Sequence, residues 1–226
     1  QEQSILDSPF DYSKQALIYI SGDLPEPSEE IEKYASAMAR RCGELVEISQ
    51  GRTFILFTSY ALMDQVFDRL QYFSGKFSLL KQGEIPTGQM IRRFKETPAV
   101  IFGTNSFWQG VDIPGDALKS VIITKLPFDV PSEPLTEARI EDLRRRSIDP
   151  FLHYQIPRAI IQTKQGFGRL IRKQSDTGVV SILDSRMIHR GYGKQFLDSL
   201  PSCKVVEDLN QVKEFFKLET KAPVKN

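Results

Sequence analysis

Along the chain, short runs of apolar residues alternate with longer stretches in which apolar residues recur at every third or fourth position. The short runs are rich in valine, isoleucine, leucine and phenylalanine, which is typical of strands buried on both faces of a parallel sheet. The longer stretches are typical of amphipathic helices. The alternation therefore predicts an α/β domain with a mainly parallel β-sheet flanked by helices. The predicted strands are residues 16–20, 53–58, 77–80, 99–102, 120–124 and 178–183.

Helices are predicted between these strands. One follows Pro27 and the candidate N-cap Ser28, and another follows Ser59. Both carry apolar residues at helical spacing, which indicates faces packed in the core rather than functional sites. These apolar residues are Ile31, Ala35, Met38, Cys42 and Leu45 in the first helix and Leu62, Val66, Leu70 and Phe73 in the second. Further helices are predicted at residues 89–95, 132–146, 157–172, 192–200 and 212–217.

The composition excludes a disordered chain and leaves nucleic-acid binding open. Hydrophobic residues make up 40% of the 226 positions, which is enough to form a full core. The formal net charge of +1 gives no overall electrostatic attraction to nucleic acid and does not exclude it. Cys42 and Cys203 lie far apart, so neither a disulfide framework nor a zinc cluster is predicted. Such sparse cysteine fits a reducing cytosol and predicts a cytoplasmic location.

Two further features concern membranes and the start of the chain. No apolar run approaches the roughly 20 residues of a membrane span, so no membrane partner is predicted. The chain begins with Gln-Glu-Gln-Ser, without an initiator methionine or a signal-peptide core. We therefore expect an internal or C-terminal part of a longer protein.

The motifs of a self-sufficient active site are missing from the sequence. It contains no GxxxxGK[ST] phosphate loop, no HExxH helix, no GxSxG elbow and no GxGxxG after a strand. His153 and His189 are the only histidines and no cysteine is near either, which disfavours Ser-His and Cys-His catalysis. No metal-ligand set is predicted. We expect the chain to act as part of a larger catalytic unit.

The strongest candidate for chemistry reads Gln-Gly-Phe-Gly-Arg-Leu-Ile-Arg, from Gln165 to Arg172. In a helix, Gln165, Arg169 and Arg172 are spaced i, i+4 and i+7 and share one face. Guanidinium groups keep their charge and present a planar fork of donors, so the pair suits a terminal phosphate. Gly166 and Gly168, each costing about 1 kcal/mol inside a helix, suggest close approach of a ligand. An exposed polar face with an accidental glycine pair is the alternative.

A second candidate follows the predicted strand 99–102. Thr104, Gly110 and Asp112 would place a hydroxyl, a close backbone approach and a carboxylate along one edge of the sheet. Asp112 could accept from a ribose hydroxyl, pair with the arginines or cap a turn. Trp108 either packs against the sheet edge or contacts nucleic acid.

A third candidate, Thr58-Ser59-Tyr60, ends the predicted strand 53–58 and opens a helix. Backbone N–H groups and hydroxyls at a helix N-terminus bind anions, so Thr58 and Ser59 could hold a DNA phosphate. An ordinary N-cap at Ser59 is the alternative, and the two roles are compatible. Because parallel sheets bind ligands at the carboxyl ends of their strands, we expect all three candidates at that edge.

These motifs, in this order, resemble those of superfamily 2 helicases. Residues 104–112 and 165–172 resemble motifs V and VI, and residues 53–59 resemble motif IV. The sequence around them is similar to the C-terminal lobe of DinG-type helicases, which are relatives of the XPD group. This similarity is concentrated at residues 8–10, 107–115, 125–128 and 183–186, and the resemblance extends over about residues 8–200.

The resemblance implies a RecA-like three-layer domain, the second lobe of a two-lobe DNA translocase. The lobe is expected at residues 15–217, after a lead-in at 1–14 from the missing first lobe and before a flexible tail at 218–226. In this family the first lobe carries the phosphate loop and a DEAH-type box, and ATP binds between the lobes. The resemblance thus implies ATP with Mg²⁺ held mainly by the missing lobe, and single-stranded DNA and that lobe as partners.

The resemblance also implies roles for single residues. Arg172 would be the arginine finger and Arg169 its γ-phosphate partner. The ATP-facing residues implied are Gln165, Gly168, Arg169, Arg172, Gly110 and Asp112. The DNA-contacting residues implied are Thr58, Ser59, Thr104 and Trp108. Lobe closure on ATP and reopening after hydrolysis would then produce translocation.

Three alternatives remain open. Some members of the family carry an exonuclease domain, and there the helicase-like lobe could clamp DNA for a fused 3'-5' exonuclease without true unwinding. A degenerate lobe that only binds DNA or a partner is disfavoured by the retained Arg169 and Arg172. An unrelated flavodoxin-like or transferase domain is the third. In the helicase interpretation, the lobe alone is expected to hydrolyse no ATP.

Overall fold

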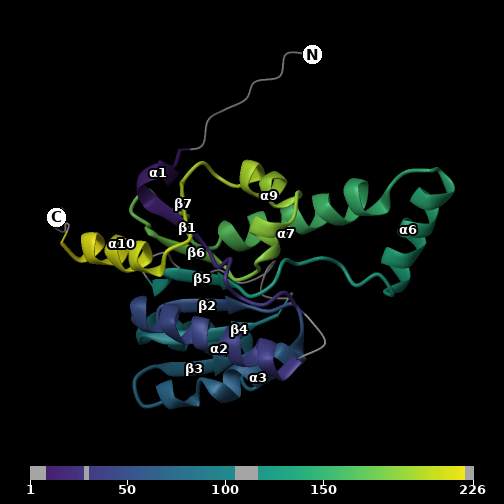
Figure 1. Ribbon diagram of the computed structural model, residues 1–226. Helices are drawn as coiled ribbons and strands as arrows, with labels where there is room; N and C mark the ends of the chain where they lie inside the picture. Colours follow the sequence, from purple (N-terminus) through teal and green to yellow (C-terminus); the bar gives the residue numbers. More distant parts are fainter. Residues whose placement is uncertain (1–8, 28–30, 105–116, 222–226) are drawn as a thin grey trace.

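A sheet of seven parallel strands forms the middle of the computed structural model, which describes residues 9–27, 31–104 and 117–221 (Figure 1). The strand order is β3-β4-β2-β5-β6-β1-β7. The strands are β1 (Ala16–Ile20), β2 (Thr53–Leu56), β3 (Ser78–Lys81), β4 (Ala99–Gly103), β5 (Ser120–Ile123), β6 (Gly178–Ile182) and β7 (Lys204–Val206). The first strand in the sequence therefore lies between the last two.

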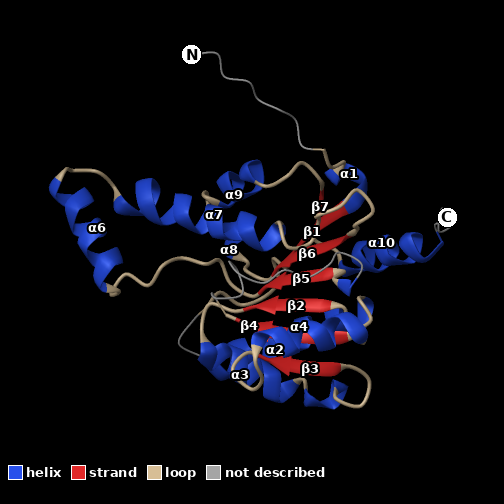
Figure 2. Ribbon diagram, turned by 180° about the vertical axis from the view of Figure 1, so that it is seen from behind, coloured by secondary structure: helices blue, strands red, loops and turns tan. Residues whose placement is uncertain are grey.

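Helices cover both faces of this sheet (Figure 2). The α-helices are α1 (Tyr12–Gln15), α2 (Ile31–Ile48), α3 (Tyr60–Arg69), α4 (Thr87–Glu96), α6 (Pro134–Arg145), α7 (Ile156–Phe167), α8 (Arg186–His189), α9 (Gly193–Ser199) and α10 (Leu209–Lys221). A 3₁₀ turn, η1 (Gln71–Phe73), follows α3, and a π-helical turn, η3 (Phe151–Gln155), precedes α7.

Two apolar cores separate the helices from the sheet. On one face, Met90 of α4, Phe167 of α7 and Phe196 of α9 pack against the strands. On the other face, Met38 of α2 and Val66 of α3 do so. The resulting three-layer architecture with a parallel sheet confirms the predicted fold class.

All six predicted strands are present, but a seventh was missed. Strand β7 has only three residues, and two of them are exposed because the strand lies at the edge of the sheet. Such a short edge strand lacks the continuous apolar run of a central strand.

The prediction of one helix over residues 157–172 is wrong at its end. Helix α7 ends at Phe167, and Gly168 is its C-cap. Tighter turns follow, in which Arg169 N donates to Gly166 O (3.2 Å) and Leu170 N donates to Phe167 O (3.0 Å). Leu170 and the next residue are buried, so packing against the sheet turns the chain away from the helical path. Gln165, Arg169 and Arg172 therefore do not share one helical face.

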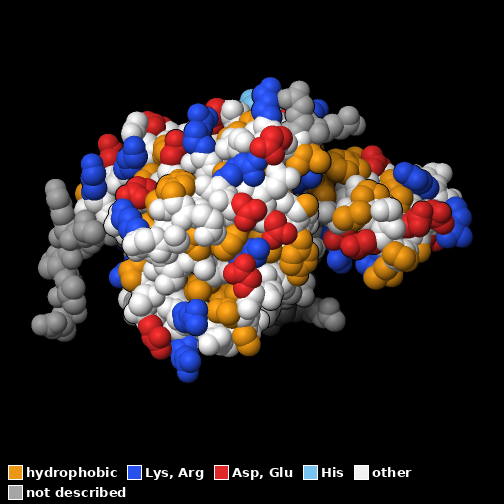
Figure 3. Space-filling model, turned by 90° about the horizontal axis from the view of Figure 1, so that it is seen from below, with side chains coloured by type: hydrophobic (Ala, Val, Ile, Leu, Met, Phe, Trp, Pro, Cys, Tyr) orange, Lys and Arg blue, Asp and Glu red, His pale blue; other side chains and the backbone are white. Residues whose placement is uncertain are grey.

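Helix α6 and the start of α7 extend away from the rest of the domain as an arm (Figures 1 and 3). Large apolar side chains are exposed on these helices and on η3 between them, including Leu135, Leu152 and Ile161. Within the described ranges, no helix is both long enough and apolar enough to cross a membrane.

Candidate functional site

The carboxyl ends of β2 and β4 bring two of the predicted DNA-binding segments together. The two strands pair with Leu56 beside Gly103, and Phe57 N donates to the carbonyl of Gly103 (2.8 Å). Thr58 follows β2 at the same edge at which Thr104 follows β4. Because the strands pair in parallel, the segments after β2 and β4 form one surface although they are far apart in the sequence.

Ser59 is the N-cap of α3. Its backbone is extended, with φ −148°, and its Oγ accepts a hydrogen bond from Leu62 N (3.4 Å). The side chain is exposed, and that of Thr58 is half-buried. Capping uses the serine oxygen only as an acceptor, so the hydroxyl hydrogen can still be donated to a phosphate. The N-cap is thus present, and it leaves a role in DNA binding open.

Thr104 is buried, and its hydroxyl is already engaged. Its backbone N and its Oγ1 both donate to Gln82 Oε1, at 2.6 and 3.0 Å. Gln82 Nε2 donates in turn to the hydroxyl of Tyr60 (3.0 Å). Tyr60 is 56% exposed, and an exposed ring of this kind is a surface on which nucleic-acid bases stack. Sequence reasoning missed the roles of Tyr60 and Gln82, because only the fold brings the end of β3 next to the start of α3.

A hollow of about 460 Å³ opens at this edge, and its lining includes Thr58, Ser59, Lys125 and Arg186. Burial lowers the pKa of Lys125, and the positive charge of Arg186 acts in the same direction. Arg186 is paired with Asp184, whereas Lys125 forms no ion pair within the described part of the chain. A half-buried ammonium group in this setting is stabilised by a nearby anion. Lys125 is a third residue whose role sequence reasoning missed.

The arginine segment lies at the opposite edge of the sheet. The loop from Arg172 to Asp176 leads into β6, so it precedes a strand instead of following one. The expectation that all candidate segments lie at the carboxyl edge is therefore wrong for this segment. Gln165 is exposed on the last turn of α7, and Arg169 lies in the turn that follows.

Arg169 and Arg172 are both half-buried. Burial lowers the pKa of both guanidinium groups, and the carboxylate of Asp176 opposes this effect at Arg172. Both groups stay charged at neutral pH, because the ordinary pKa of arginine is above about 12. Partly dehydrated cations attract an anion more strongly than fully hydrated ones do. This edge of the lobe is therefore suited to a phosphate.

The remaining predicted residues give a mixed result. A Cβ atom on Gly168 would have Lys164 O as its nearest neighbour, at 3.4 Å, so the described protein atoms do not require a glycine there. Its role in the approach of a ligand stays a prediction. Trp108, Gly110 and Asp112 lie outside the described residues, and their roles stay predictions as well.

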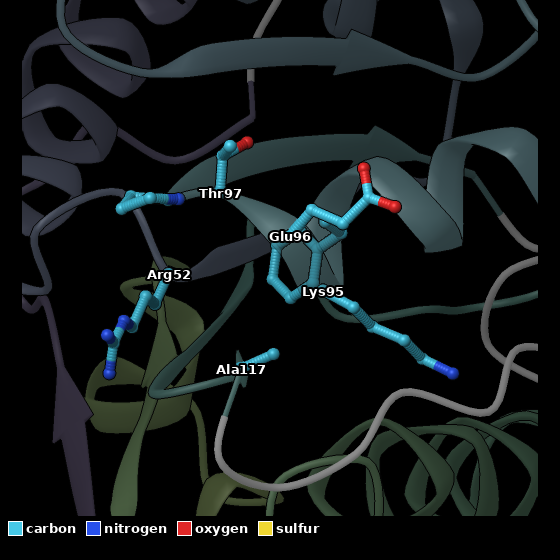
Figure 4. Close-up of a pocket in the computed structure, with 7 residues that line it drawn as sticks. Arg52, Lys95, Glu96, Thr97 and Ala117 are labelled. Atoms are coloured by element: carbon cyan, nitrogen blue, oxygen red, sulfur yellow. The ribbon is translucent and has the colours of Figure 1, made fainter.

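A second hollow, of about 280 Å³, is lined by residues such as Arg52, Lys95 and Ala117 at the amino edge. Figure 4 shows the side chains of Arg52 and Lys95 leading away from each other, so they do not converge on one ligand. None of the predicted site residues lines this hollow. The ranges that the structure describes also contain no group of three or more histidines, cysteines or carboxylates suited to a metal ion.

A parallel sheet between two helical layers, with polar segments at one edge and an arginine pair at the other, defines a RecA-like lobe. The sequence profile of the Helicase C-terminal domain family matches residues 42–203. The chain belongs to this family. Its sequence is similar to those of helicases named YoaA and DinG, and its fold is similar to that of XPD.

Three similar proteins illustrate this relationship. The chain is 45% identical to the ATP-dependent DNA helicase YoaA of Haemophilus influenzae, over 94% of this chain and 33% of YoaA. It is 34% identical to the 3'-5' exonuclease DinG of Bacillus subtilis, over 89% of this chain and 22% of that protein. The structure of Xpd4 from S. tokodaii superposes with a TM-score of 0.63 at 16% identity, over 87% of this chain and 39% of Xpd4. The chain thus spans about a third or less of the curated relatives' length.

Proposed function

We propose that this chain is the second motor lobe of an ATP-dependent DNA helicase or translocase of the DinG type. The lobe spans residues 15–217, with a lead-in before it and a tail after it. Arg172 serves as the arginine finger, and Arg169 is its partner at the γ-phosphate. The observation that supports these roles is the pair of half-buried guanidinium groups at one edge of the lobe.

The nucleotide binds mainly to the other lobe. When bound, ATP with Mg²⁺ supplies the phosphoryl transfer that drives the motor. As the family resemblance implies, the Mg²⁺ is held mainly by the other lobe. This lobe forms the far wall of the site, in which Gln165 and Gly168 extend the arginine segment, and Gly110 and Asp112 line the nucleotide side. The arginines stabilise negative charge on the phosphate oxygens.

Single-stranded DNA binds at the carboxyl edge. The DNA phosphates contact the hydroxyl groups of Thr58 and Ser59 and the ammonium group of Lys125. The exposed ring of Tyr60 stacks on a base. Thr104 supports this surface through Gln82, and Trp108 contributes to it. When the two lobes close around ATP and reopen, this DNA-binding surface moves relative to the DNA-binding surface of the other lobe.

The experiment is the ATPase rate of the complete protein with Arg172→Ala. Arginine fingers contribute about 10³-fold to 10⁵-fold to turnover, so DNA-stimulated hydrolysis is expected to be nearly abolished while the fold is kept. Arg144→Ala is the matched control, because Arg144 is an exposed arginine on α6. A loss of less than about tenfold on Arg172→Ala would contradict the assignment.

The isolated lobe provides a separate test. It is expected to hydrolyse no ATP, because the phosphate loop of the family belongs to the other lobe. Turnover that copurifies with the lobe and disappears in Arg172→Ala would show that the chemistry does not need the missing lobe. A cytoplasmic location belongs to the same proposal.

A second candidate function is a DNA-clamping module that serves a fused 3'-5' exonuclease. The observation that favours it is the name of the Bacillus subtilis relative, a 3'-5' exonuclease. A motor changes its DNA affinity with the bound nucleotide, whereas a clamp does not. Equal affinity of the complete protein for single-stranded DNA with and without a non-hydrolysable ATP analogue would favour the clamp.

A further inference from the structure

The side chain of Gln15 holds the loop that carries Arg172. Gln15 is the last residue of α1, and its side-chain amide is buried. Its Nε2 donates to three backbone carbonyl oxygens of that loop, those of Lys173 (3.0 Å), Gln174 (3.1 Å) and Asp176 (2.9 Å). One amide nitrogen thus binds three carbonyl groups of the same loop. Gln15 and Asp176 are 161 positions apart in the sequence.

The carboxylate of Asp176 also stabilises this loop by hydrogen bonds to its backbone. Its Oδ2 accepts hydrogen bonds from the backbone N of Arg172 and from that of Lys173, both at 2.8 Å. The residue is only 1% exposed. A buried carboxylate is costly unless it is hydrogen-bonded, and bonds to a charged acceptor are among the stronger ones. The backbone of Arg172 is therefore fixed by a charged group within its own loop.

The sheet aligns these two side chains. Gln15 directly precedes β1, and Asp176 lies two residues before β6. The two strands pair in parallel with Ala16 beside Gly178, so the residues just before them meet at the amino edge. The contact between Gln15 and the loop therefore lies directly beside a pair of buried, hydrogen-bonded strands.

We propose that Gln15 and Asp176 are positioning residues for Arg172, fixing its backbone at the geometry that ATP hydrolysis requires. This inference rests on the proposed function, because it takes Arg172 as the arginine finger. Neither residue touches the nucleotide in this proposal. Both act by removing the freedom of the loop, and a misplacement of about 1 Å at a catalytic group costs on the order of 10²-fold in rate.

The test uses the full-length protein, including the upstream lobe, with Gln15→Ala, Gln15→Glu, Asp176→Ala and Asp176→Asn. Gln15→Glu keeps the shape of the side chain but removes the donor, whereas Asp176→Asn keeps an oxygen that accepts from Arg172 N. Gln71→Ala is the control, because Gln71 is exposed and, among the described residues, its side-chain amide donates only to Phe67 O one turn back.

The expected result is a split between kinetic constants. Gln15→Ala, Gln15→Glu and Asp176→Ala lower kcat for DNA-stimulated hydrolysis by about 10-fold to 10²-fold. The KM for ATP and the affinity for single-stranded DNA stay within about twofold. Asp176→Asn retains more activity than Asp176→Ala. Amide hydrogen exchange at Arg172 and Lys173 becomes about tenfold faster, while exchange in β6 is unchanged.

A double mutant tests whether Gln15 acts through Arg172. In an Arg172→Ala background, Gln15→Ala is expected to cause no further loss, because the group that it positions is gone. An equal loss in both backgrounds would overturn the inference. Wild-type kcat in Gln15→Ala, with Arg172→Ala inactive, would overturn it and leave the proposed function intact.

Two other outcomes are also decisive. Unimpaired hydrolysis in Arg172→Ala would overturn the proposed function itself. Fast exchange throughout β6 in all four variants would assign Gln15 and Asp176 to the stability of the sheet and would overturn the positioning role.

Discussion

Asp184 and Arg186 form an ion pair with two hydrogen bonds beneath the hollow at the carboxyl edge. Arg186 Nε donates to Asp184 Oδ1 (2.8 Å), and Arg186 Nη2 donates to Oδ2 (2.6 Å). The same Oδ2 accepts from Leu126 N (2.8 Å), so the carboxylate also holds the chain that leaves β5. The guanidinium group lies over the ring of Phe128, 5.4 Å from its centroid. The pair thus joins the loops after β5 and β6.

Asp184→Ala is expected to lower the free energy of unfolding of the complete protein by about 3–5 kcal/mol. The substitution leaves the Arg186 guanidinium and the Leu126 amide without their acceptor in a buried site. Denaturant titration followed by circular dichroism would measure this change. Asp198→Ala, at an exposed position on α9, is the control, and an equal effect of the two substitutions would contradict the role of the pair.

Lys125→Ala is expected to weaken single-stranded DNA binding and to make it less sensitive to salt. Each phosphate neutralised on a single strand contributes about 0.7 to the slope of log K against log salt, so the slope should fall by about that amount. Lys76→Ala is the control, because Lys76 is exposed and paired with Glu47. An unchanged slope in Lys125→Ala would show that this ammonium group contacts no phosphate.

Acid is expected to remove a contribution of Asp23 to stability. Hydrogen bonds from Arg41 lower the pKa of Asp23 from 3.8 to about 2. A lowered folded-state pKa stabilises the fold above about pH 4, and this stabilisation is lost as the pH falls toward 2. Because Asp23 is largely exposed, the effect is below about 1 kcal/mol. Unfolding of Asp23→Asn should therefore differ from wild type at pH 7 and converge with it near pH 2.

The two cysteines are expected to resist alkylation in the folded protein. Burial raises the pKa of the Cys42 thiol, and that of Cys203 to about 11. The thiolate is the reactive form, so at pH 8 Cys203 should react roughly 10²-fold more slowly than an ordinary cysteine, and Cys42 only after unfolding. Mass spectrometry of iodoacetamide-treated protein would measure both rates. Rapid labelling of Cys42 under native conditions would contradict its burial.

The strands were predictable because burial on both faces leaves a continuous apolar run, as at Val100 and Ile101 in β4. The end of α7 was mispredicted because Arg169 and Arg172 fit a helical stripe and the two glycines of this segment suggest the approach of a ligand. Gly168 instead caps the helix, and Leu170 and Ile171 then pack in the core.

The site was predictable as a set of residue types but not as a geometry. Sequence order suggested that polar segments follow strands, whereas Arg172 precedes β6. Tyr60 and Lys125 lie in segments that the sequence singled out, but their individual roles were missed because their surroundings depend on strand register. Gln15 was hidden for the same reason, since its partners are more than 150 positions away.

The position of β1 between β6 and β7 determines when the sheet can be completed during synthesis. Ala16 leaves the ribosome long before Gly178, and at about 5–20 residues per second the wait lasts on the order of ten to thirty seconds. Until then the apolar strand β1 cannot pair with β6 or with β7. A gene fragment begun at residue 42, where the family profile starts, would omit this strand and leave a gap in the sheet. Any expression boundary for the lobe therefore has to lie ahead of β1, and incomplete products are expected to aggregate.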